Sequence, residues 1–195
     1  MQQYKLMWNM SKNRPYEYAD FFIKDNDGSV IQTLDLAGKE GDVVGYVGIK
    51  SDKVLDLGKI NFYDFKDFFE PIKKQGDFIY LKKDEFYILS TREAVRVPPE
   101  LACEMVSMDD RSGEFRSHYA GFIDPGWGWG KTGEEQGRPL TLEVRPFEDI
   151  IVRDNQPIAK IKFERMSAVP EIVYDGIPSN YSKQSGPKLG KNFKV

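Results

Sequence analysis

The feature that most constrains the fold is a series of short segments that alternate apolar and polar residues or run apolar, each ended by turn-forming residues. Breaks at 25–28 (Asp-Asn-Asp-Gly) and 38–41 (Gly-Lys-Glu-Gly) are typical of turns, and a period of two is typical of strands that bury one face. Strands are predicted at 20–25, 29–36, 42–50, 78–81, 85–91, 100–108, 140–144, 149–153 and 157–166. Many short strands at this spacing predict a mainly β fold, either a distorted barrel or a jelly-roll-like sandwich.

One segment has the spacing of a helix instead. In residues 62–74 (FYDFKDFFEPIKK), charged residues alternate with aromatic ones in a roughly helical stripe, and Pro71 limits its length. We therefore expect one or two short helices beside the strands.

Composition divides the chain into three parts. Residues 1–17 are polar and irregular and are expected to form an N-terminal extension, whereas 18–178 carry the predicted strands and suit one β domain. Residues 179–195, called the C-terminal segment below, are polar and rich in Gly, Ser and Lys. Composition alone predicts that this segment is mobile.

The histidine and cysteine counts restrict the chemistry. His118 and Cys103 are the only residues of their types, so they cannot supply a Cys₂His₂, Cys₄ or His/Cys/Cys zinc site or an internal disulfide. Hydrolysis must then depend on carboxylates, hydroxyls and bound water, or on a metal that the substrate carries. A net charge of -3 gives no reason to expect nucleic-acid or membrane binding. The lack of long apolar runs and the unpaired cysteine predict a cytoplasmic protein.

A glycine-rich stretch at 126–137 (GWGWGKTGEEQG) ends like a phosphate-binding P-loop. Pro125 stands where the first P-loop glycine belongs, and the residues after Thr132 are poor helix formers. We therefore reject a P-loop and expect a surface insertion between strands. The preceding 120–128 (AGFIDPGWG) predicts a rigid corner. It is either a hairpin turn or a pocket wall of backbone groups that Asp124 supports.

Two further segments carry candidate site residues. In 140–145, alternation places Thr141, Glu143 and Arg145 on one face. The residues alone favour a solvated strand face with a weak Glu143–Arg145 pair, and the alternative is a carboxylate at the mouth of a barrel that takes a proton from water. In 113–121, Glu114, Arg116 and His118 share one face and suit substrate phosphates and a polar base edge, although a lone histidine is more often structural.

The ordered set of motifs resembles the dCTP deaminase branch of the dUTPase-like superfamily over about residues 75–190. The motifs of this set are residues 85–91, 95–99, 120–127, 140–144, 157–163 and 181–187. The C-terminal half of the long two-repeat bacterial dCTP deaminases is more similar still, through 41–46, 67–72, 113–121 and 188–193.

This resemblance implies a dUTPase-like barrel that deaminates dCTP to dUTP and ammonia for dTTP synthesis without zinc. It implies that Glu143 activates the water that attacks C4 of cytosine, and that Ala120 and Gly121 hold the base. Tyr181 and Gln184 would close over the triphosphate, which brings Mg²⁺ with it. The other substrate-binding candidates are Arg111, Ser112, Arg116, His118 and Asp124.

The chain departs from the family at one motif. Residues 109–116 stand where the family has an Arg-Ser-Ser motif. This stretch is shorter than the family's motif and lacks its double serine. We therefore expect either a half-enzyme that needs a partner chain or a shifted site that uses Arg116 and His118. Family sites assembled between subunits imply a trimer-like homo-oligomer or pairing with an N-terminal-half repeat. A non-catalytic domain and a dUTP pyrophosphatase remain alternatives. The pyrophosphatase is disfavoured because such enzymes usually end in a Gly-rich arm with Arg, Gly, Phe and Ser that stacks on uracil, and the C-terminal segment has no such pattern.

Overall fold

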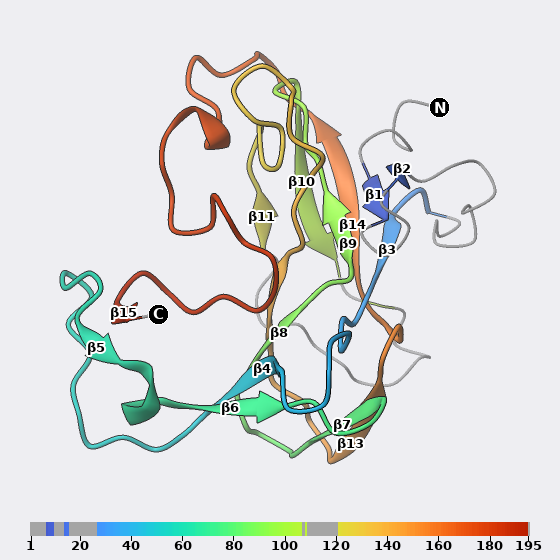
Figure 1. Ribbon diagram of the computed structural model, residues 1–195. Coiled ribbons are helices and arrows are strands. Elements are labelled where there is room, and N and C mark those ends of the chain that lie inside the picture. The colour runs from blue at the N-terminus through green and yellow to red at the C-terminus, as the bar shows by residue number, and fades with distance from the viewer. Residues whose placement is uncertain (1–6, 10–13, 16–26, 107, 109–120, 195) are drawn as a thin grey trace.

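The computed structural model describes residues 7–9, 14–15, 27–106, 108 and 121–194, and its framework is two four-stranded antiparallel sheets (Figure 1). The first sheet has the order β11 (Phe122–Ile123), β10 (Leu101–Val106), β14 (Pro157–Arg165) and β3 (Val30–Thr33). The second has the order β12 (Thr141–Val144), β8 (Tyr87–Ser90), β4 (Val43–Gly48) and β6 (Phe69–Lys73).

Three smaller sheets and two short 3₁₀ helices complete the described fold. The sheets pair β2 (Arg14–Pro15), β1 (Met7–Asn9) and β9 (Glu93–Val95); β13 (Ile150–Arg153) and β7 (Phe78–Leu81); and β15 (Phe193–Lys194) with β5 (Tyr63–Asp64). The helices are η3 (Phe65–Asp67) and η5 (Tyr174–Gly176). The mainly β prediction is confirmed, and eight of the nine predicted segments contain an observed strand, while 20–25 lies outside the described residues. No helix in the described part of the chain is long and apolar enough to span a membrane.

Strand β8 is buried on both faces because it separates two hydrophobic clusters. Its Tyr87 and Leu89 point into the main core between the sheets, whereas Ile88 packs with Leu189 and Phe193 in a second cluster. Opposite directions for successive side chains follow from the pleat of a strand. The C-terminal segment therefore covers the outer face of the second sheet, and Figure 1 shows it running down to β15 beside β5.

The prediction of a helix in 62–74 is wrong. Only η3 is helical, where the Asp64 carboxylate caps the N–H of Lys66, and β6 follows as an edge strand paired with β4. Pro71 lacks the N–H that a helix interior needs, but an edge strand tolerates it. The aromatic spacing serves the second cluster instead, where Phe68 and Phe69 make edge-to-face contacts with Phe193 at 5.6 and 5.4 Å.

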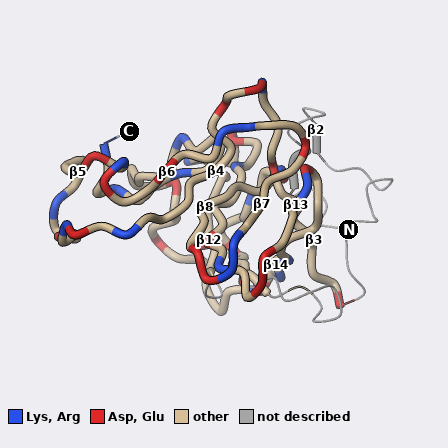
Figure 2. Tube along the Cα trace, turned by 90° about the horizontal axis from the view of Figure 1, so that it is seen from below, with Lys and Arg blue, Asp and Glu red and all other residues tan. Residues whose placement is uncertain are grey.

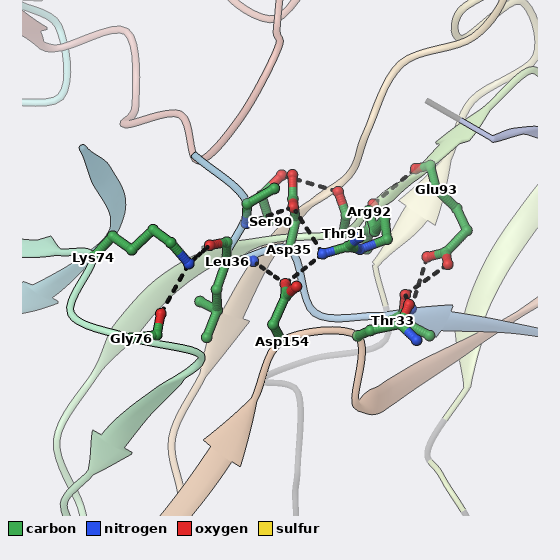
Figure 3. A network of polar contacts seen from close by, with 12 residues as sticks. Thr33, Asp35, Leu36, Lys74, Gly76, Ser90, Thr91, Arg92, Glu93 and Asp154 are labelled. Atoms are coloured by element: carbon green, nitrogen blue, oxygen red, sulfur yellow. Dashed lines mark hydrogen bonds and ion pairs between the residues drawn. The ribbon is translucent and has the colours of Figure 1, made fainter. Parts of the chain in front are cut away.

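A polar network joins the ends of several strands (Figure 3). The Arg92 guanidinium pairs with Asp35 and Asp154, and the Asp154 carboxylate also accepts the N–H of Leu36. The buried Glu93 carboxylate accepts hydrogen bonds from the N–H and the hydroxyl of Thr33, each at 2.7 Å. Along the rest of the trace, Lys and Arg residues are interspersed with Asp and Glu (Figure 2).

Candidate functional site

A pocket of about 350 Å³ lies where the 121–127 corner, strand β12 and the C-terminal segment meet. Five of the predicted site residues line it: Gly121, Asp124, Glu143, Tyr181 and Gln184. The other five, which are Arg111, Ser112, Arg116, His118 and Ala120, lie outside the described residues. Segments far apart in the sequence thus bring a carboxylate, a phenol and an amide to one cavity.

Glu143 reaches this pocket from the exposed face of β12. Leu142 and Val144 point into the core, so the alternation of the strand turns Glu143 to the opposite side. The side chain is exposed in this single chain. Arg145 does not share the pocket; it lines a separate hollow of about 840 Å³ with Lys82 and Glu85. The geometry therefore favours the pocket-edge interpretation of Glu143 over a Glu143–Arg145 pair on a plain solvated face.

The predicted corner is present and is held by backbone hydrogen bonds. Trp127 N–H donates to the Asp124 carbonyl at 3.1 Å, and Gly126 N–H donates to the Val97 carbonyl at 3.0 Å. Gly126 has a φ of +87°, and a Cβ there would lie 2.5 Å from Cβ of Val173. The corner thus requires glycine both for its backbone angle and for its close contact with the chain before η5.

The expectation that 126–137 is a surface insertion is wrong for its first half. Gly126, Trp127 and Gly128 are buried, and the Trp127 side chain belongs to the main core, because the aromatic ring fills the space beside η5. In the second half, the Glu134 carboxylate accepts the N–H groups of Thr132 and Lys131. These bonds lower the pKa of Glu134 to about 2. The amides that copy the end of a P-loop are therefore occupied by the chain's own carboxylate.

The C-terminal segment is packed along the pocket, in contrast to its polar composition. Gln184 is buried and donates from its side-chain amide to the Pro139 carbonyl at 3.1 Å and to the Thr141 hydroxyl at 2.8 Å. Burial raises the pKa of the Tyr181 phenol, and the negative charge of Glu143 raises it further. Tyr181 and Glu143 are therefore electrostatic neighbours across the pocket.

Two polar atoms of the pocket-lining side chains have no hydrogen-bond partner among the described residues. The indole N–H of Trp127 and the side-chain oxygen of Gln184 are both buried and unpaired. Buried polar groups are rarely left unsatisfied, and exceptions call for a specific explanation. One donor and one acceptor in the wall of the pocket are thus left unpaired, although neither atom is exposed to the cavity.

Tyr174 is a pocket residue that the sequence reasoning missed. It lies in η5, its ring centroid is 4.9 Å from that of Trp127, and its hydroxyl accepts from the Ser179 hydroxyl at 3.0 Å. An isolated tyrosine in an irregular stretch has no periodic pattern around it. The only signal for Tyr174 in the sequence is that it is an aromatic residue seven positions before Tyr181.

The part of the chain that the structure describes contains no cluster of side chains that could bind a metal ion. Within those ranges, no three side chains from His, Cys, Asp and Glu gather closely enough to hold an ion.

The comparisons with known proteins find a matching family model and a similar solved structure. The family model described as "2'-deoxycytidine 5'-triphosphate deaminase (DCD), C-terminal domain" matches residues 10–193. The crystal structure of 2'-deoxycytidine 5'-triphosphate deaminase from Agrobacterium tumefaciens is similar, with 39% sequence identity and a TM-score of 0.67. The match covers 76% of this chain and 43% of that one, so this chain corresponds to less than half of the solved protein. A search of curated proteins gave no match.

Proposed function

The chain belongs to the 2'-deoxycytidine 5'-triphosphate deaminase family, and from that premise we propose that it takes part in the hydrolytic deamination of dCTP to dUTP and ammonia. The observation that carries the proposal is the pocket that gathers Glu143, Tyr181 and Gln184 from separate parts of the chain. A concave site lined by a carboxylate, a phenol and an amide suits a small polar ring.

In the proposed reaction, Glu143 acts as general base and then as general acid. Its carboxylate removes a proton from a water molecule, and the resulting hydroxide adds to C4 of cytosine. Glu143 passes this proton to N3 and then moves the proton of the new C4 hydroxyl to the amino group, which leaves as ammonia while C4 becomes a carbonyl.

The proposed chemistry uses no zinc. Zinc deaminases hold their metal with one histidine and two cysteines or with three cysteines, and this sequence has one residue of each type. We assign Mg²⁺ to the substrate, where it accompanies the triphosphate. Glutamate-activated water then replaces metal-activated water.

A site completed by a second chain is part of this proposal. The matched family model describes a C-terminal domain, and the Agrobacterium tumefaciens chain extends well beyond the matched region. Residues 109–116 also lack the double serine, and Glu143 is exposed in the single chain. We propose that another copy or an N-terminal-half chain covers Glu143 and supplies the missing hydroxyl groups.

The test is a product assay with the purified protein, Mg²⁺ and either dCTP or dUTP. Ammonia from dCTP, released by the chain alone or after addition of an N-terminal-half chain, supports the proposal. Pyrophosphate from dUTP without ammonia from dCTP would replace it with a pyrophosphatase function. If neither product forms with or without the second half, the chain is a non-catalytic domain.

A further inference from the structure

Arg138 is a buried cation that neither the proposed chemistry nor the motifs use. It lies between the glycine-rich stretch and β12, and its side chain is 9% exposed. The guanidinium forms an ion pair with Asp175 and donates to the Ser182 carbonyl at 2.5 Å. It also lies over the rings of Trp127 and Tyr174, at 4.8 and 5.9 Å from their centroids.

The partner carboxylate extends this contact to a third segment. One Asp175 oxygen pairs with Arg138, and the other accepts the N–H of Gly130 at 2.9 Å. The pair therefore joins the glycine-rich stretch, helix η5 and the C-terminal segment. Because the Asp175 side chain is only 7% exposed, removal of either partner leaves a buried charge without compensation.

The contact with Ser182 lies beside the Gln184 contacts. Gln184 bonds to Pro139 and Thr141, so residues 138–141 hold the C-terminal segment at two points two residues apart. Tyr181 immediately precedes the first of these points and lines the pocket with Glu143. The bond from Arg138 to Ser182 is of a stronger type than the bonds from Gln184, because hydrogen bonds from a cation are roughly twice as strong as neutral ones.

We infer that Arg138, held by Asp175, is a positioning residue that fixes the C-terminal segment against β12, so that Tyr181 and Gln184 face Glu143 before any nucleotide binds. The nucleotide part of this inference rests on the proposed function. The positioning part rests only on contacts within the chain. Loss of Arg138 should weaken nucleotide binding more than the chemical step, because Glu143 is carried by β12 itself.

The first measurement is hydrogen exchange of residues 179–194 without nucleotide, in wild type, Arg138→Met and Asp175→Asn. Arg92→Met is the matched control, because Arg92 is also a mostly buried arginine that pairs with two aspartates but lies in the separate network of Figure 3. We expect exchange in the C-terminal segment to rise about tenfold or more in Arg138→Met, and by a smaller factor in Asp175→Asn, since a charge-assisted bond is lost. The control should leave exchange there unchanged even if its overall stability falls.

The second measurement is the KM and kcat for dCTP with the same variants, in whichever assembly shows turnover. Arg138→Met should raise KM about tenfold with a much smaller change in kcat, because it removes interactions that hold bound nucleotide. Unchanged exchange of the C-terminal segment in folded Arg138→Met and Asp175→Asn overturns the inference, and so does an equal rise in Arg92→Met. If wild type itself shows no turnover, the proposed function fails, and the exchange data still decide the positioning role.

Discussion

The side-chain amide of Gln184 donates to the Thr141 hydroxyl at 2.8 Å, which fixes the C-terminal segment two residues from Glu143 along β12. A segment whose composition predicts mobility is thereby part of the pocket wall. Gln184 itself is buried, and so is its second bond, to the Pro139 carbonyl, so loss of this side chain leaves a buried polar group without a partner.

Gln184→Ala should lower the free energy of unfolding by about 1–3 kcal/mol, because the Pro139 carbonyl and the Thr141 hydroxyl then lose a buried donor. It should also weaken nucleotide binding. Chemical denaturation and calorimetric titration with dCTP measure the two effects. Thr141→Val is the comparison, since it removes only one of the two bonds and should cost about 1 kcal/mol. Wild-type affinity in Gln184→Ala would show that this amide does not shape the pocket.

Gly126→Ala should destabilise the corner through both its backbone angle and its packing. Gly126 has a φ of +87°, and a Cβ there would lie 2.5 Å from Cβ of Val173. Gly76 has a φ of +74°, and a Cβ there would have nothing within 4 Å. Gly76→Ala therefore measures the backbone cost alone, about 1–2 kcal/mol, and Gly126→Ala should cost about 2–4 kcal/mol. Thermal or urea unfolding measures both variants. If the two lose equal free energy of unfolding, the chain before η5 moves away from the added Cβ at little cost.

Glu93 should make the protein less stable as the pH rises. Burial raises the pKa of its carboxyl above the ordinary 4.5, although hydrogen bonds from Thr33 partly oppose the shift. The folded state then keeps a proton that the unfolded state releases, so the free energy of unfolding falls as pH rises from about 4.5 towards the folded pKa.

Glu93→Gln should remove this dependence, because the amide does not ionise and its oxygen can still accept the N–H of Thr33. The wild-type stability measured relative to the variant should fall by at most about 1.4 kcal/mol per pH unit across that window and then level off. Urea unfolding at a series of pH values gives the curve. Glu135→Gln, at an exposed position, is the control, and a constant difference between wild type and Glu93→Gln would contradict the prediction.

The strands were predictable because their pattern is local. The segment 78–81 coincides with β7, and 140–144 contains β12 with Leu142 and Val144 turned inward as the alternation requires. The helix prediction at 62–74 failed because the aromatic spacing reflects packing against Phe193, which lies far along the chain. Local propensity yields to such tertiary contacts.

The candidate site was predictable only in part. Glu143, Tyr181 and Gln184 stand in motifs with family-like spacing, and the structure brings them to one pocket. The Arg138–Asp175 pair joins residues 37 positions apart in irregular segments, and no periodicity connects them. Such a pair becomes visible only when η5 is seen packed beside the glycine-rich stretch.

The most direct test of the account is ammonia release from dCTP by wild type and Glu143→Gln in the assembly that shows turnover, with dCTP affinity measured on the same samples. Wild type should release ammonia. Glu143→Gln should lose at least about 10²-fold in kcat, the usual contribution of a general base, while it binds dCTP within a few-fold of wild type. Ammonia release by Glu143→Gln at the wild-type rate would contradict the central claim that this carboxylate activates the attacking water.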